Sequence, residues 1–125
     1  MYLNRGDDWL NTSEVVSGFI LELRRGILTL CVLSKLNEPT YGYNLVEKLL
    51  RNGVSVEANT LYPMLRRMES KGLIQSTWNT EGAKPRKYYR TTEEGRNTLE
   101  LLKRHWYSTV QSINVVLEED SDNGK

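Results

Sequence analysis

The residues best suited to chemistry are basic, and they lie in two short stretches: NTLYPMLRRMESKGLI at 59–74 and EGAKPRK at 81–87. Between Asn59 and Arg90 seven basic residues stand against two acidic ones, a net charge of +5 in a chain whose formal net charge is +1. Guanidinium groups bond phosphate oxygens and guanine edges, and ammonium groups pair with phosphate. The segment therefore favours a nucleic acid as the partner, while the near-zero charge of the whole chain keeps a protein partner as the alternative.

Patterns typical of catalysis or metal binding are absent from the sequence. We find no nucleophile–base pair and no glycine-rich phosphate loop, and one histidine with one cysteine is too few for a zinc site. We therefore expect no enzymatic activity, no cofactor and no metal. Cys31 lies in the apolar run ILTLCVL, where a thiol packs as a small hydrophobic group, and a lone cysteine fits a reducing cytoplasm. No apolar run approaches the roughly 18 residues of a membrane span, so we expect no membrane partner.

Hydrophobic periodicity predicts the helices that precede the basic stretches. Apolar residues recur every three or four positions through 16–31, which predicts a first helix to about Leu36. Asn11 and Glu14 have the spacing of an N-cap and its N3 partner. Residues 1–11 have no period, and we expect a mobile tail there.

A second helix is predicted over residues 41–51. Thr40 follows Pro39 and can cap this helix, and Asn52-Gly53 can end it. The next three residues, 54–56, fit a brief strand.

The stretch 59–74 predicts a third helix that Gly72 stops. Its buried stripe follows i, i+3, i+4, i+7 spacing, and its outer face holds the polar and basic residues. The stripe is Leu61, Met64, Leu65 and Met68; the outer face is Thr60, Pro63, Arg66, Arg67 and Ser70, with Tyr62 at the border. If Asn59 or Thr60 caps the helix, Pro63 lies at N4 or N3, where its missing N–H costs at most one hydrogen bond.

Two strands and a long helix complete the chain. Residues 73–80 alternate in character and 86–91 are rich in β-forming residues, so the turn between them predicts a hairpin with a basic tip. Thr91 and Glu94 have the spacing of a capping box for a last helix that runs to roughly Glu119. Its apolar residues repeat at 3-4-3-4-3 spacing, which is typical of a seam that packs on another helix.

The order of these elements describes a mainly α fold with a small β-hairpin (α+β), a winged helix-turn-helix with a long C-terminal dimerisation helix. We divide the chain into a mobile tail at 1–11, a DNA-binding domain at 12–92, the dimerisation helix at 93–119 and an acidic tail at 120–125. In a winged helix the third helix and the hairpin tip lie on one side of the domain. Both basic stretches would then face the same duplex.

Three blocks of the sequence resemble the PadR family of transcription regulators: LTLCVLSKLNEPTYGY, NTLYPMLRRMESKGLI and KYYRTTEEG. The likeness spans about residues 23–106, and Thr91 stands where that family usually has Leu. The single C-terminal helix resembles the short, dimeric subclass. The resemblance implies a repressor-like homodimer, with the third helix in the major groove and the wing near the minor groove or the backbone. The two-fold symmetry of such a dimer predicts an inverted-repeat operator. It also implies that this helix begins a few residues before Thr60, which would make Pro63 an interior proline. A winged-helix adaptor that binds protein instead of DNA is the alternative.

The candidate site residues follow from these patterns and from the resemblance. For DNA binding they are Tyr41, Asn59, Thr60, Tyr62, Pro63, Arg66, Arg67, Lys84, Arg86 and Lys87. For the dimer interface they are Phe19, Leu23, Leu99, Leu102, Trp106, Thr109, Ile113 and Val116. Trp106 lies eleven residues after Gly95, a spacing that by resemblance places it where some family members hold planar aromatic ligands. Aromatic residues at helical spacing are more often packing than a ligand platform, so both interpretations of Trp106 stay open.

Overall fold

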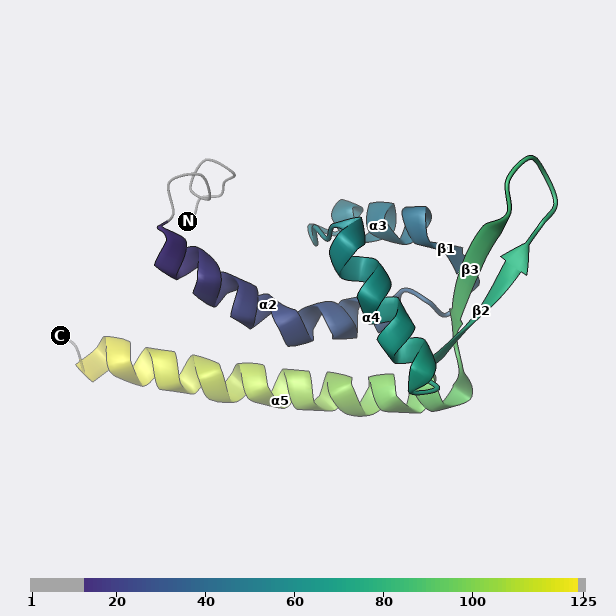
Figure 1. Cartoon of the computed structure of the whole chain (residues 1–125). Helices are drawn as coiled ribbons and strands as arrows, with labels where there is room; N and C mark the ends of the chain where they lie inside the picture. Colours follow the sequence, from purple (N-terminus) through teal and green to yellow (C-terminus); the bar gives the residue numbers. More distant parts are fainter. Residues whose placement is uncertain (1–12, 124–125) are drawn as a thin grey trace.

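The computed structural model describes residues 13–123, with side chains from residue 13 to residue 119 (Figure 1). In this part of the chain four helices and a three-stranded antiparallel sheet follow in the order α2, β1, α3, α4, β2, β3 and α5. Their bounds are α2 Glu14–Ser34, β1 Thr40–Tyr41, α3 Gly42–Arg51, α4 Ala58–Ser70, β2 Ile74–Asn79, β3 Arg86–Thr91 and α5 Glu93–Asn123. The predicted α+β winged helix-turn-helix is confirmed. The tail predicted at 1–11 lies outside the described residues.

Helix α2 begins later than the sequence predicted. Its N-cap is Ser13, whose Oγ accepts a hydrogen bond of 3.3 Å from the Val16 amide. Asn11, the predicted cap, lies outside the described residues. The helix ends at Ser34, two residues before the predicted end at Leu36.

A short strand that the sequence did not reveal precedes α3. Thr40 and Tyr41 form β1 and pair with Tyr89 and Tyr88 of β3. The predicted cap Thr40 is wrong, because this residue is buried and its hydroxyl donates to the Glu38 carbonyl at 2.8 Å. Tyr41 is the N-cap instead, without a side-chain capping bond.

The segment after α3 is a loop, so the strand predicted at 54–56 is wrong. The Val54 amide donates to the Leu49 carbonyl at 2.8 Å, which closes the end of α3. Val56 is buried in the core and anchors the loop just before α4. Val54 is therefore bonded to α3 and Val56 is packed in the core, so neither residue is part of a strand.

Helix α4 carries the predicted buried stripe of two leucines and two methionines, which is confirmed. Its N-cap is Glu57, so Pro63 is the sixth helical residue rather than the third or fourth. The position derived from a cap at Asn59 or Thr60 is therefore wrong, and the interior proline implied by the family resemblance is confirmed. Pro63 cannot donate to the Asn59 carbonyl, and because Asn59 is exposed, water can replace that bond.

Strands β2 and β3 form the wing, with Ile74 paired to Thr91 near the core and Asn79 paired to Arg86 at the tip. Thr91 belongs to β3, so its predicted role as the cap of α5 is wrong. Its buried hydroxyl instead donates to the Leu36 carbonyl at 2.8 Å, beyond the end of α2. Thr92 caps α5, since its Oγ1 accepts from the Gly95 amide at 3.0 Å. Helix α5 then runs four residues past the predicted end at Glu119.

The core lies where α2, α3, α4 and the sheet meet, and α2 and α5 extend from it in one direction (Figure 1). The 31 residues of α5 give it a length of about 46 Å. Much of that length lies beyond the core, together with the N-terminal half of α2. No helix in the described range 13–123 is long and apolar enough to cross a bilayer.

Candidate nucleic-acid interface

The outer face of α4 presents the predicted polar and basic side chains to solvent. Asn59, Thr60, Pro63, Arg66 and Arg67 are all exposed on this helix. Among the described side chains the only ion pair joins Lys103 to Glu100 on α5, so neither arginine of α4 has a carboxylate partner there. These guanidinium groups are therefore free to bind an external anion.

Tyr62 lies at the border of this face and packs inside the protein. It is half-buried, and a Cβ built on Gly42 would lie 2.5 Å from the Tyr62 hydroxyl oxygen and 3.0 Å from the ring. The tyrosine therefore fills the space that glycine leaves at the start of α3. Its ring holds α4 against α3, a role that its border position on the helix did not reveal.

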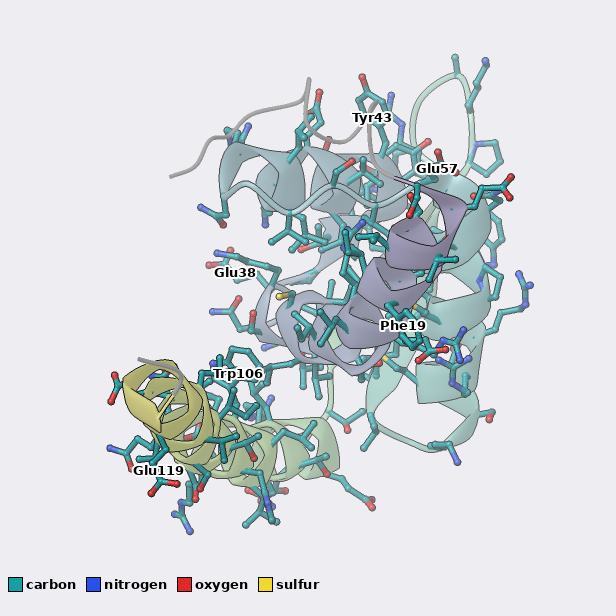
Figure 2. All side chains as sticks on the ribbon, turned by 90° about the vertical axis from the view of Figure 1, so that its left-hand side faces the viewer. Phe19, Glu38, Tyr43, Glu57, Trp106 and Glu119 are labelled. Atoms are coloured by element: carbon teal, nitrogen blue, oxygen red, sulfur yellow. The ribbon has the colours of Figure 1, made fainter. Side chains whose placement is uncertain are left out.

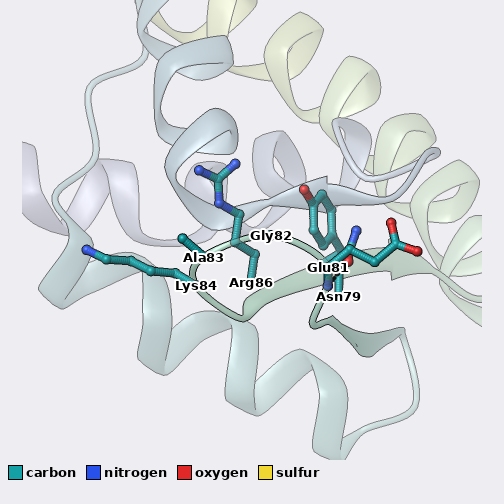
Figure 3. Close-up of a pocket in the computed structure, with 7 residues that line it drawn as sticks. Asn79, Glu81, Gly82, Ala83, Lys84 and Arg86 are labelled. Carbon is teal, nitrogen blue, oxygen red and sulfur yellow. Dashed lines mark hydrogen bonds between the residues drawn. The ribbon is translucent and has the colours of Figure 1, made fainter.

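The wing tip forms an open basic hollow of about 520 Å³, lined by Asn79, Glu81, Gly82, Ala83, Lys84, Arg86 and Tyr88 (Figure 3). Gly82 has φ of +93°, a left-handed conformation that glycine adopts without strain. The Asn79 side chain accepts a hydrogen bond of 2.9 Å from the Glu81 amide, which fixes the turn. Lys84 and Glu81 extend to opposite sides of the loop, so the acid does not neutralise the lysine.

Tyr41 belongs to a cluster of aromatic and basic residues beside the wing-tip hollow. The Arg86 guanidinium lies 5.2 Å from the centre of the Tyr41 ring, and this ring lies 6.0 Å from the ring of Tyr88. A cation over an aromatic face is held in place without losing its charge. The cluster therefore positions Arg86, and it depends on β1, which the sequence did not reveal.

Lys87 points to the other face of the wing, the face turned toward α4. Its Nζ lies 5.6 Å from the centre of the Tyr89 ring and 5.8 Å from that of Trp78. Burial of the Tyr89 side chain raises its pKa. The neighbouring Tyr62 and Glu69 raise this pKa further, whereas the positive charge of Arg66 lowers it. Tyr89 is therefore neutral, and its side chain packs on the side of the wing that faces α4.

A second basic feature, on α2, was not among the predicted site residues. Arg24 donates to the Ser55 carbonyl, and together with Arg25 it lines a groove of about 410 Å³ that reaches Thr60 on α4. Arg24 thus ties α2 to the loop that leads into α4. The adjacent arginines in an apolar helix were the available signal for this feature.

The predicted dimer residues fall into two groups. Six are exposed in this single chain, namely Phe19, Leu23, Trp106, Thr109, Ile113 and Val116. Leu99 and Leu102 are half-buried and pack against the core of their own chain. The core of the same chain therefore covers part of these two leucines, and their contact with a partner chain stays a prediction.

Trp106 lines a hollow between α2 and α5. It is 38% exposed and lies on the side of α5 that faces α2 (Figure 2). The hollow has a volume of about 420 Å³ and a mostly apolar lining of Gly26, Ile27, Thr29, Leu30, Leu102, His105, Trp106 and Thr109. A space of this size and lining can hold a small planar molecule.

Comparisons with known proteins agree with this geometry. Residues 29–101 match the transcriptional regulator PadR-like family. The structure is similar to that of a PadR family transcriptional regulator from Eggerthella lenta, at 50% identity and a TM-score of 0.78, covering 84% of this chain and 94% of that one. It is also similar to a PadR-like regulator from Bacillus cereus, at 33% identity and a TM-score of 0.68, covering 77% and 96% of the two chains. A transcriptional regulator from Mycobacterium tuberculosis is 34% identical over 79 residues, which are 62% of this chain and 74% of that protein.

Proposed function

Because the chain belongs to the PadR-like family of transcriptional regulators, we propose that it is a sequence-specific repressor that binds an inverted-repeat operator as a homodimer. The observation that carries this proposal is the pair of unneutralised basic surfaces on the outer face of α4 and at the wing tip. We propose no enzymatic activity for this chain. The site of action is the cytoplasm, where a reduced Cys31 is stable.

Helix α4 reads the major groove in this proposal. Arg66 is exposed at the edge of α4 nearest the wing and reaches guanine edges, while Thr60 and Asn59 contact bases or phosphates from the first turn. Arg67 pairs with a phosphate group of the DNA backbone. Tyr62 acts mainly by holding α4 against α3, and Pro63 contributes an apolar contact surface.

The wing supplies the backbone contacts. Lys84 and Arg86 are exposed at the tip, and the Tyr41 ring holds the Arg86 guanidinium in place. Phosphate contacts of this kind set the register of the protein on the duplex and carry no sequence information themselves. Base discrimination therefore falls to α4.

A second copy of the chain covers the exposed apolar residues of α2 and α5. Phe19 and Leu23 on α2 are 62% and 71% exposed, and Ile113 and Val116 on α5 are 48% and 57% exposed. Large apolar side chains left exposed on two helices that contact each other mark an interface. Two-fold symmetry then places two copies of α4 about one helical turn apart along the DNA, which favours an inverted-repeat operator.

The hollow beside Trp106 is the place for a small planar aromatic ligand that relieves repression. The indole offers a flat stacking face, and Thr29, Thr109 and His105 add polar groups to an otherwise apolar lining. A ligand there lies between α2 and α5, the two helices of the proposed dimer interface. Binding would therefore change the spacing of the two DNA-binding domains.

The experiment selects bound fragments from a random pool of duplexes and then measures binding of the enriched sequence by fluorescence anisotropy. Arg66→Ala should weaken binding by roughly 1 to 3 kcal/mol if Arg66 reads a base. Arg104→Ala is the matched control, because it removes the same charge from an exposed position on α5. Failure to enrich any sequence, or equal binding by both variants, would reject the proposal and favour the protein-binding adaptor.

A further inference from the structure

One face of the wing is buried near the core and becomes exposed toward the tip. Ile74, Ser76 and Trp78 occupy alternate positions of β2 and therefore share a face. Along this face Ile74 is 2% exposed and Ser76 half-buried, whereas Trp78 is 64% exposed. The inward-facing side of the strand thus ends in a large aromatic side chain that no described residue buries.

Lys87 of β3 is paired with Trp78 across the wing. Its Nζ lies between two aromatic rings, 5.8 Å from the centre of Trp78 and 5.6 Å from that of Tyr89. Among the described side chains it has no carboxylate within ion-pair distance. A flat apolar surface therefore stands beside an ammonium group that the two rings hold in place.

This face is continuous with the edge of α4 that carries Arg66. Tyr62, Arg66 and Glu69 lie along that edge at i, i+4 and i+7. The Ser76 hydroxyl donates to the Glu69 carboxylate at 2.6 Å, which fixes β2 to α4. Trp78 lies two residues further out on the same face of β2, in the angle between the wing and the helix.

We propose that Trp78 and Lys87 form a docking surface for one sugar–phosphate strand of the duplex, with the indole against deoxyribose and the ammonium on the adjoining phosphate. The proposal rests on the proposed DNA-binding function and adds a residue outside the basic stretches. A nucleic-acid backbone alternates apolar sugar with anionic phosphate, which matches the indole and ammonium in chemistry and order. Because sugar and phosphate are the same at every base pair, this contact supports affinity without reading sequence.

The test compares Trp78→Ala, Trp78→Phe and Lys87→Ala with the control Tyr107→Ala, which removes an aromatic side chain of equal exposure (63%) from α5. Binding is measured on the selected operator and on an unrelated duplex of the same length, over a series of salt concentrations. Trp78→Ala should weaken binding to both duplexes by the same factor, about five- to thirtyfold, from the apolar area that stays uncovered. Its log-log salt slope should equal that of the unmutated protein, because no charge is lost.

Lys87→Ala should make the salt slope shallower by about 2 for a dimer, since each protomer loses one phosphate contact. Trp78→Phe should stay within about threefold of the unmutated protein, because the phenyl ring keeps much of the apolar face. Tyr107→Ala should bind normally. In a variant with Trp78 as the only tryptophan (Trp9→Phe, Trp106→Phe), DNA should protect the indole from acrylamide quenching.

Normal binding by Trp78→Ala, or no protection of Trp78 by DNA, would overturn this inference while leaving the proposed function intact. A loss confined to the operator would also overturn it, because Trp78 would then read a base. If the unmutated protein binds neither duplex, the proposed function itself fails.

Discussion

Replacement of Gly95 by alanine should destabilise the protein, because the site has no room for a methyl group. Gly95 lies in the first turn of α5, against the backbone that leads into β2. A Cβ built there would lie 2.0 Å from the Leu73 carbonyl oxygen and 2.6 Å from Cγ2 of Thr91. Carbon–oxygen contacts below about 3 Å are strongly repulsive, so either α5 or the Leu73 carbonyl must move.

The Leu73 carbonyl is held by the cap of α5. It accepts from the Thr92 amide at 3.0 Å, and the Thr92 hydroxyl lies 3.1 Å away. Moving it costs overpacking strain of about 1–3 kcal/mol. Weakening one or two of these hydrogen bonds adds about 1 kcal/mol each. Gly95→Ala should therefore lower the free energy of unfolding by about 2–5 kcal/mol, which is a large part of the stability of a domain this size.

Thermal unfolding followed by far-ultraviolet circular dichroism, at one fixed protein concentration, measures this effect. At roughly 4 °C per kcal/mol for a chain of this length, the Tm should fall by about 8–20 °C. Gly18→Ala is the control, since its added Cβ meets no described atom within 4 Å outside its own helical backbone, and alanine is the better helix former. A fall of less than about 2 °C in Gly95→Ala would refute the steric reasoning.

Three further predictions concern the interface, the hollow and the core. Ile113→Glu should produce monomers with weaker DNA binding in sedimentation velocity and anisotropy, whereas Val115→Glu, on the opposite side of α5, should stay dimeric; a monomeric unmutated protein at micromolar concentration would contradict the dimer. Planar aromatic compounds should quench the fluorescence of Trp106 saturably in a variant that lacks the other two tryptophans, and flat titrations across varied compounds would leave Trp106 as packing. Thr91→Val should lower the free energy of unfolding in urea by about 1 kcal/mol, because the hydroxyl bond to the Leu36 carbonyl is lost while the backbone bond remains; an unchanged stability would contradict that role.

Local signals predicted the parts of the fold that depend on residues close in sequence. The buried stripe of α4 follows helical spacing, and β3 has the predicted bounds, 86–91. The hairpin also follows from its own turn residues. In each case the contacts that decide the structure join neighbouring positions.

Contacts between distant residues explain why the two predicted threonine caps are wrong. Thr40 and Thr91 each stand close before a helix, where a threonine is a good cap, yet both pair or bond with segments more than 45 residues away. The residues next to Thr40 and Thr91 in the sequence do not reveal these distant partners. In the same way the seam of α5 shows which residues are apolar, but not whether Leu102 packs on its own chain or on another copy.

The salt dependence of DNA binding tests the central claim most directly. If the wing of each protomer neutralises about three phosphates through Lys84, Arg86 and Lys87, a dimer neutralises about six. The wing alone should then make the logarithm of the binding constant fall with the logarithm of salt concentration at a slope of about −5, and the Arg67 contacts should make the slope steeper. A slope near zero, or no binding to the selected duplex at low salt, would contradict DNA recognition by this surface.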